Sequence, residues 1–169
     1  GVEGGMHLAA GSEHNEAGVI TENASNRAQM MEKRMSKLEA MRSELPEALV
    51  HGDPRAEIAI FGYGSNRGPI VEAQNRLRAL GVPTRFFEFR TRWPFPEDEV
   101  RAFVEHAEHV FVVENNYTGQ LERLIRYVVG PLERMHAVLK YDGRPFRPLE
   151  IIDPIERHAL VRAGSSHPS

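Results

Sequence analysis

The spacing of hydrophobic and polar residues divides the chain into a polar first stretch, one long helical stretch and a region where short apolar runs alternate with helical patterns. Residues 1–25 are polar and rich in glycine, and we expect an extended arm there that lies on a partner surface. From Asn26 onward apolar residues recur at helical spacing, which predicts an amphipathic helix and a linker over residues 26–50. Pro46 and a turn at residues 51–54 would end the helix.

Four methionines lie on the apolar face of this predicted helix: Met30, Met31, Met35 and Met41. The commoner arrangement is that such a face packs against the chain's own domain. The alternative is a docking stripe for a partner, because methionine adapts to irregular surfaces.

Beyond Arg55 the pattern is typical of a doubly wound α/β domain, which we predict over residues 51–162. The apolar runs predict strands at residues 57–61, 84–89, 109–114 and 136–140. The helical patterns lie at residues 68–80, 97–107 and 120–128, and residues 147–162 predict a short helix or loop. Residues 163–169 are expected to be a disordered tail.

Composition narrows the classes of function. The 169 residues include no cysteine, so this chain can supply no disulfide, no thiolate for an iron–sulfur cluster and no thiol nucleophile. The net charge of -3 does not indicate the positively charged surface that is typical of proteins that bind nucleic acid. No apolar run approaches the roughly 18 residues that span a bilayer, and the first residues lack a secretory pattern. We therefore expect a cytoplasmic domain that binds neither nucleic acid nor membrane, and the first residue, Gly1, indicates a piece of a longer protein.

The first candidate site is a glycine-rich loop between a predicted strand and the helix that follows it. Its spacing is G-x-G-x-x-x-G, which matches neither the dinucleotide fingerprint nor a phosphate-binding P-loop. Either it is a structural turn, or its backbone N–H groups and polar side chains contact a ligand or a subunit. The candidate residues are Gly62, Gly64, Ser65, Asn66, Arg67 and Gly68.

The second candidate site is the polar cluster over residues 114–120, which again follows a strand and opens a helix. Polar groups at the end of a parallel strand are typical of a binding site or a wet interface. Equally, they could cap the helix and satisfy buried backbone groups. The candidate residues are Asn115, Asn116, Tyr117 and Gln120.

Metal binding and hydrolysis have little support in the sequence. His7, Glu13, His14 and Glu16 are possible metal ligands, but one irregular segment seldom supplies a preorganised site. The G-x-S-x-G pattern of a serine hydrolase is absent. We expect no catalytic residue and no metal ligand on this chain.

Several motifs resemble, in order, the C-terminal domain of the alpha subunit of 2-oxoacid:ferredoxin oxidoreductases and the stretch that leads into it. GSEHNEAG at residues 11–18 and MEKRMSKLE at residues 31–39 resemble the leading stretch. The later matches are GYGS at 62–65, TRWPFP at 91–96, VENNYTGQL at 113–121 and YDGRPF at 141–146. The EHNEAG arm is most similar to the 2-oxoglutarate, KorA-type branch.

The resemblance implies a three-layer αβα sandwich on a mostly parallel sheet, similar to the transketolase C-terminal domain. It also implies an enzyme that oxidatively decarboxylates a 2-oxoacid, 2-oxoglutarate in this branch, to acyl-CoA and reduces ferredoxin. Thiamine diphosphate, Mg²⁺ and an iron–sulfur cluster belong to the rest of that complex, and none is expected on this chain. The implied partners are the remaining alpha-subunit domains, the beta subunit, ferredoxin and coenzyme A.

The motifs that hold the diphosphate and the thiamine ring are missing from this sequence, so the chain alone is expected to be inactive. Its expected role is subunit packing and completion of the active-site cleft. One alternative is a stand-alone flavodoxin-like module that binds an anion at the loop over residues 62–68. Another is a purely structural scaffold subunit.

Overall fold

The computed structural model describes residues 1–8 and 10–160, so the predicted tail at 163–169 lies outside the described residues. The chain divides into two compact units, Gly1–Leu45 and a second unit that starts at Pro46. The finer domain limits given above stay predictions.

The first unit consists of the arm and the predicted helix. Helix α1 covers Ala24–Ala40 and continues as a 3-10 turn over Met41–Glu44. It begins two residues earlier than expected because the Asn23 side chain accepts hydrogen bonds from the backbone N–H groups of Ser25 and Asn26. The helix is therefore confirmed, with an N-cap that the hydrophobic spacing alone does not locate.

The methionines of α1 differ in exposure. Met30 is buried, whereas Met31, Met35 and Met41 are exposed. Within the first unit, three of the four methionines are therefore left uncovered, and both alternatives for this face stay predictions.

The second unit is built on a five-stranded sheet of order β1-β3-β2-β4-β5. Strands β3, β2, β4 and β5 are parallel, and β1 is antiparallel to β3. The strands are β1 Leu49–Gly52, β2 Ile58–Tyr63, β3 Thr84–Phe89, β4 His109–Glu114 and β5 Met135–Leu139. The helices are α2 Arg67–Ala79, α3 Glu97–Val104, α4 Gln120–Val129 and α5 Pro148–Ile155, followed by a π-helical turn over Glu156–Leu160.

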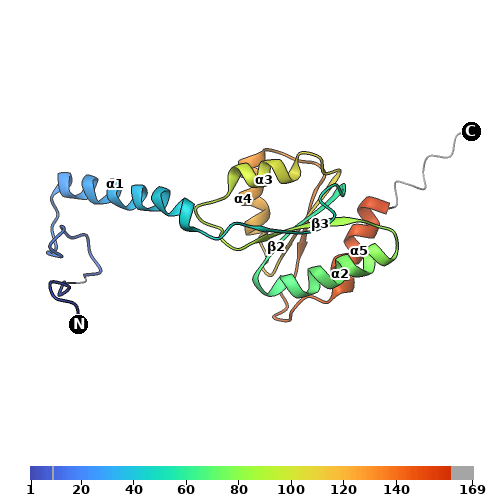
Figure 1. The fold of residues 1–169 in the computed structure, drawn as a ribbon, viewed down its shortest axis with the longest axis horizontal. Coiled ribbons are helices and arrows are strands. Elements are labelled where there is room, and N and C mark those ends of the chain that lie inside the picture. The colour runs from blue at the N-terminus through green and yellow to red at the C-terminus, as the bar shows by residue number, and fades with distance from the viewer. Residues whose placement is uncertain (9, 161–169) are drawn as a thin grey trace, which may run out of the picture. The chain divides into compact units, whose positions relative to one another are not determined.

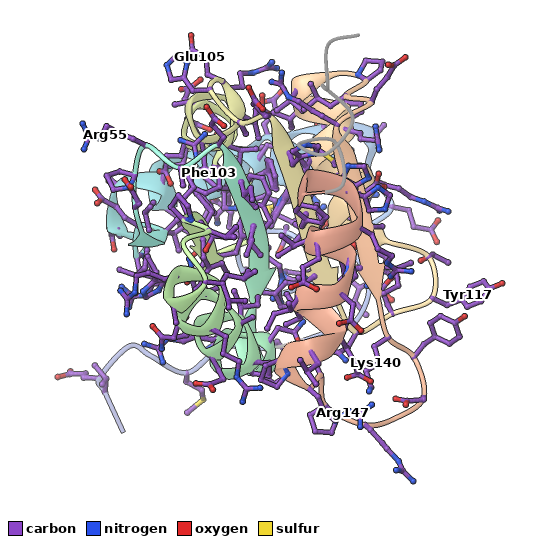
Figure 2. The ribbon with its side chains drawn as sticks, turned by 90° about the vertical axis from the view of Figure 1, so that its right-hand side faces the viewer. Arg55, Phe103, Glu105, Tyr117, Lys140 and Arg147 are labelled. Carbon is purple, nitrogen blue, oxygen red and sulfur yellow. The ribbon has the colours of Figure 1, made fainter. Side chains whose placement is uncertain are left out.

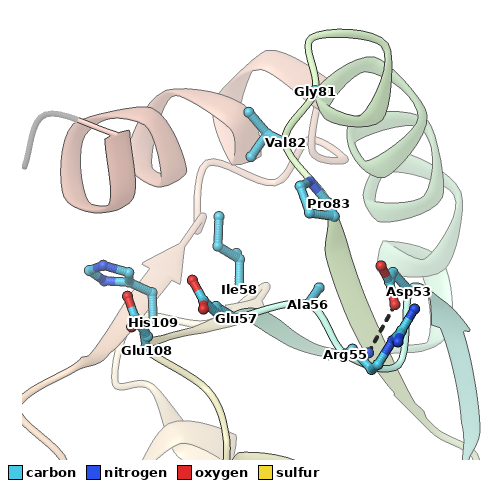
Figure 3. A pocket seen from close by; sticks show the side chains of 10 residues that line it. All are labelled: Asp53, Arg55, Ala56, Glu57, Ile58, Gly81, Val82, Pro83, Glu108 and His109. Atoms are coloured by element: carbon cyan, nitrogen blue, oxygen red, sulfur yellow. Dashed lines mark hydrogen bonds between the residues drawn. The ribbon is translucent and has the colours of Figure 1, made fainter. Parts of the chain in front are cut away.

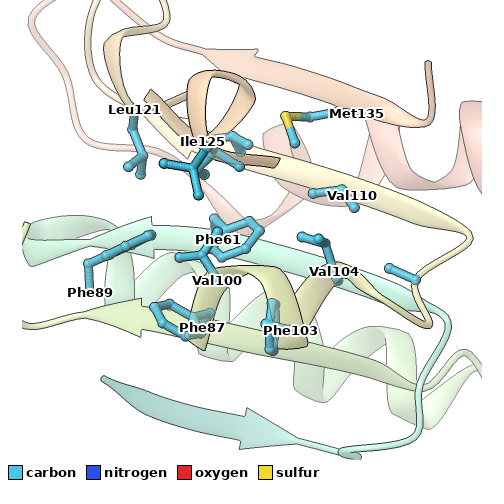
Figure 4. Close-up of a cluster of buried hydrophobic side chains, with 14 of the residues drawn as sticks. Phe61, Phe87, Phe89, Val100, Phe103, Val104, Val110, Leu121, Ile125 and Met135 are labelled. Carbon is cyan, nitrogen blue, oxygen red and sulfur yellow. The ribbon is translucent and has the colours of Figure 1, made fainter. Parts of the chain in front are cut away.

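The helices cover both faces of the sheet. Figure 1 shows α3 and α4 on one side and α2 and α5 on the other. Successive strand residues point to opposite faces, so Ile60 packs with Ile70 while Phe61 packs with Phe103. Figure 4 shows the cluster that contains Phe61, on the side of α3 and α4. The predicted three-layer αβα sandwich with a mostly parallel sheet is confirmed.

The sequence prediction missed one strand. Residues expected to belong to a linker and a turn form β1, in which Leu49 pairs with Glu88 of β3. The strand has only four residues, and its apolar side chains, Leu49 and Val50, are exposed, so it carries no alternating pattern. It ends at Gly52, where φ is +89° and a Cβ would lie 2.2 Å from the carbonyl oxygen of Thr84.

Candidate functional site

The strand order brings the two candidate loops to one place. After β2 the chain forms β3 on one side of β2, and later forms β4 on the other side. The loops that follow β2 and β4 therefore flank the point where the strand order reverses, and open α/β sheets bind ligands at this point. The Asn66 side-chain amide donates a hydrogen bond of 3.2 Å to the carbonyl oxygen of Val113, which ties the first loop to the end of β4, directly before the second loop.

The glycines of the first loop have different roles. At Gly62 a Cβ would lie 2.4 Å from Cδ1 of Ile70, so the core leaves no room for a side chain. Gly64 has a φ of +58° with open space around it, so its conformation, not its packing, requires glycine. Gly68 meets no neighbour within 4 Å and has no such conformation. Packing therefore requires glycine at position 62 and the turn requires it at position 64, whereas neither requires Gly68.

The polar residues of the first loop divide into a buried and an exposed group. Asn66 is 3% exposed and its amide is used by the bond to Val113. Ser65 is exposed. Nε of Arg67 lies 3.1 Å from a Glu88 carboxylate oxygen, which also lies 2.7 Å from Nε2 of His51. Glu88 thus offsets the one positive charge within residues 62–68, which weakens the case for an anion site there.

The second loop is organised by a buried carboxylate, Glu114. This side chain is fully buried and accepts hydrogen bonds from the backbone N–H groups of Leu121 at 2.9 Å and Glu122 at 3.0 Å, and from the Asn116 amide. A helix leaves its first N–H groups without backbone partners, and its N-terminus favours negative charge. Glu114 therefore caps α4 from inside the protein. The sequence places Glu114 in the predicted polar cluster, at the end of an apolar strand, but does not single it out as a candidate site residue.

Asn116 is a structural residue. Its side-chain oxygen accepts hydrogen bonds from the backbone N–H groups of Thr118, Gly119 and Gln120, at 3.1, 2.7 and 3.3 Å. Its amide group donates to Glu114. For Asn116, the capping alternative is the one that the geometry supports.

The other predicted residues of this loop face solvent. Asn115, Tyr117 and Gln120 are exposed. The ring of Tyr117 packs edge-on against that of Tyr141, with centroids 4.9 Å apart, although both side chains are largely exposed. Figure 2 shows Tyr117 projecting outward from the body of the domain. The carboxyl edge of the sheet therefore presents hydrogen-bonding groups beside a projecting aromatic pair.

A cavity of about 430 Å³ opens at the opposite edge of the sheet, where β2 and β4 begin (Figure 3). Its charged and titratable lining residues are Asp53, Arg55, Glu57, Glu108 and His109. Over residues 1–8 and 10–160, no group of three or more His, Asp or Glu side chains is arranged to hold a metal ion. In the same part of the chain, no helix has the length and apolar character needed to cross a membrane.

These features define a doubly wound α/β domain with two polar loops at the switch point of its sheet. Residues 56–151 match the family described as pyruvate:ferredoxin oxidoreductase core domain II. The chain belongs to this family. The motif resemblance to alpha subunits of 2-oxoacid:ferredoxin oxidoreductases is thereby confirmed.

Relatives of this chain are subunits of oxidoreductases. Over 89% of its length the chain is 36% identical to the alpha subunit of 2-oxoacid:ferredoxin oxidoreductase 2 from Aeropyrum pernix. Over 59% it is 33% identical to 2-oxoglutarate synthase subunit KorA from Methanothermobacter thermautotrophicus. It covers 24% and 26% of these proteins, so the chain spans about a quarter of their length.

Two solved structures are similar to the fold. A 2-oxoglutarate:ferredoxin oxidoreductase from Magnetococcus marinus, with 2-oxoglutarate, coenzyme A and succinyl-CoA bound, matches 90% of this chain and 27% of its own, with a TM-score of 0.77 and 28% identity. A split-gene transketolase, an inactive beta4 tetramer, matches 68% of this chain and 41% of its own, with a TM-score of 0.58 and 15% identity. The latter likeness supports the transketolase-like fold alone.

Proposed function

We propose that this chain is the assembly domain of a 2-oxoacid:ferredoxin oxidoreductase alpha subunit. In this proposal it packs against the remaining alpha-subunit domains and the beta subunit and completes a wall of the active-site cleft. The enzyme oxidatively decarboxylates a 2-oxoacid to acyl-CoA and passes the electrons to ferredoxin. Family membership and the names of the relatives support this reaction.

The observation that carries the proposal is the pair of polar loops at the switch point. The Asn66–Val113 hydrogen bond ties the first loop to the end of β4, while Asn115, Tyr117 and Gln120 of the second loop keep their side chains exposed. Exposed hydrogen-bonding groups beside aromatic rings suit a subunit interface, where aromatic residues are enriched.

The donor groups of this chain do not fit the cofactors of such an enzyme. It contains no cysteine for an iron–sulfur cluster, and the described residues offer no cluster of side chains for a metal ion. We therefore assign thiamine diphosphate, Mg²⁺ and the iron–sulfur cluster to the rest of the complex. In this proposal the chain itself contributes a wall of the active-site cleft and contacts with the other subunit domains.

We further propose 2-oxoglutarate as the oxoacid. The support is the EHNEAG arm, the KorA relatives and the Magnetococcus marinus structure, which has 2-oxoglutarate bound. Comparing turnover of 2-oxoglutarate, pyruvate and 2-oxobutyrate by the assembled enzyme tests this choice. Preference for pyruvate would contradict it.

The assembly role is tested in the complete alpha–beta enzyme with the double variant Asn115→Ala, Gln120→Ala. We expect weaker subunit association in analytical ultracentrifugation, or lower 2-oxoacid- and coenzyme A-dependent reduction of a viologen dye. The matched control is Arg123→Ala, also exposed but one turn along α4. Equal association and turnover in the double variant and the unaltered enzyme would reject the proposal.

A further inference from the structure

Strand β1 is the outermost strand of the sheet, and one edge of its backbone is open. The backbone N–H of Asp53 donates a hydrogen bond of 3.1 Å to the carbonyl oxygen of Thr84. In the same register His51 lies opposite Phe86. Opposed residues of an antiparallel pair alternate between bonded and non-bonded positions, so Val50 turns its N–H and C=O groups away from β3. An open edge of this kind can pair with a further strand.

The side chains of β1 leave this edge accessible. Leu49 is 42% exposed and Val50 is 54% exposed, and the two point to opposite faces of the sheet. The sequence of the strand, LVHG, contains neither lysine nor proline, two residues that commonly protect an edge against pairing. Because the strand has only four residues, backbone pairing alone would hold a partner weakly. A partner therefore needs side-chain contacts beside the strand.

A pocket of about 530 Å³ beside β1 offers such contacts. Val50 lines it from β1, Phe87 from β3, and Ala102 and Phe103 from α3. Phe87 and Phe103 also belong to the core cluster shown in Figure 4, so this apolar wall is part of the folded core. Val50 belongs both to the open edge and to the pocket. An apolar side chain that projects from an added strand on this face of the sheet would therefore enter the pocket.

The charge at the pocket is negative where an occupant can reach it. Glu47 and Glu99 line the pocket, are exposed, and form no ion pair within the described part of the chain. The third charged lining residue, Arg85, is buried in the wall. Its Nη1 donates to the carbonyl oxygen of Pro54 at 3.2 Å, and its guanidinium carbon lies 5.0 Å from the ring centroid of Phe103. The two exposed carboxylates favour a basic residue on the partner.

We propose that β1 and this pocket bind an extended segment of a partner protein, which adds to the sheet beside β1. The segment inserts one apolar side chain into the pocket and places a lysine or arginine two residues away, beside Glu47 or Glu99. Side chains two residues apart share one face of a strand at a separation of about 7 Å, which sets this spacing. None of the lining residues belongs to the two switch-point loops, so this surface is separate from the proposed assembly surface.

A second copy of this chain fits the edge less well. Antiparallel pairing of β1 with itself, centred on Val50, would set Glu47 of one copy opposite Asp53 of the other. Like charges in directly opposed positions destabilise a strand pair. The charges therefore favour a basic segment from a different protein.

The first test is a titration of the 169-residue chain with the peptide acetyl-KTLTK-amide, whose pattern is the same in both strand directions. We expect saturable ¹H–¹⁵N NMR shifts at Val50 and Ala102, and slower hydrogen exchange of the Val50 N–H because the added strand accepts its hydrogen bond. The charge-reversed peptide acetyl-ETLTE-amide should bind at least about fivefold more weakly. Equal binding of the two peptides, binding without protection of the Val50 N–H, or no saturable shift would overturn the proposal.

Variants test the two carboxylates. The double variant Glu47→Gln, Glu99→Gln alters exposed side chains only, and we expect it to bind acetyl-KTLTK-amide at least about fivefold more weakly than the unaltered chain. Glu105→Gln is the matched control, because Glu105 lies at the end of α3 but outside the lining, and its affinity should not change. Undiminished affinity in the double variant would refute the assigned charges. Protection of the Val50 N–H that grows with the concentration of the chain alone would assign the edge to a second copy and would also reject the proposal.

Discussion

The side-chain amide of Asn66 reaches across the switch point of the sheet and donates a hydrogen bond to the carbonyl oxygen of Val113, 47 residues further along the chain. Asn66 lies at the start of α2 and Val113 near the end of β4. One buried side chain therefore ties the first of the two loops that we assign to subunit contact to the strand that leads into the second.

Replacing Asn66 tests the strength of this link. Asn66→Ala leaves the Val113 carbonyl oxygen without this donor, and we expect a loss of about 1–3 kcal/mol in the free energy of unfolding. Urea unfolding followed by circular dichroism measures it. The neighbouring exposed residue provides the control, because Ser65→Ala should change stability by less than about 0.5 kcal/mol. Equal effects of the two substitutions would mean that the bond contributes little.

Glu114 should be more important for stability than its place in a loop cluster implies. Glu114→Gln replaces one of two carboxylate acceptors of backbone N–H groups by an amide donor, and we expect the domain to lose about 2 kcal/mol or more. Asn116→Ala removes the outer cap and should cost about 1 kcal/mol. Gln120→Ala, at an exposed side chain, serves as control. Thermal and urea unfolding of the three variants should preserve this order, and a neutral Glu114→Gln would disprove the buried cap.

The three glycines of the first loop should respond differently to alanine. Gly62→Ala forces its methyl group against Ile70 and should cost about 1–3 kcal/mol. Gly64→Ala places a side chain at positive φ, with a cost of about 1–2 kcal/mol. Gly68→Ala meets open space inside α2 and should be neutral or stabilising by up to about 1 kcal/mol. Melting curves of the three variants check this ranking, which fails if Gly68→Ala is the most harmful.

The arm of the first unit is held by a pH-sensitive contact. Hydrogen bonds from Arg34, and secondarily from Arg27, lower the pKa of Glu13 from 4.5 to about 2 against the opposing effect of desolvation. A carboxyl group with a depressed pKa stabilises the folded arm above its unfolded pKa. That stabilisation is lost as the pH falls from about 4.5 to about 2.

An NMR titration of the Glu13 carboxyl carbon measures this pKa directly. Arg34→Gln should move it back toward its ordinary value, and should weaken the bridge between His14 and Ile20 at neutral pH. Lys33→Gln is the control, because Lys33 is paired with Glu16 instead. An unshifted pKa in the Arg34 variant would show that this ion pair does not set it.

The sequence by itself determined the succession of helices and strands and, through its motifs, the family. Strands 84–89 and 109–114 were predicted with the bounds observed, because buried parallel strands are continuous apolar runs that need no knowledge of their neighbours. The short strand β1 has exposed side chains and is held by backbone pairing with β3, so no local pattern reveals it.

Only the tertiary structure decided which groups meet. The order of the strands brings Asn66 to Val113, turns Asn116 inward as a cap and leaves Gln120 exposed, although both residues are polar members of one motif. Arg85 is a second example. In the sequence it is a single charged residue in a mostly apolar strand, and only the fold shows that it is buried, beside a pocket lined by residues of β1 and α3. Burial and pairing depend on residues distant in the chain, whereas periodicity depends on near neighbours. The fold class could therefore be predicted from local sequence patterns, whereas the arrangement of the site could not.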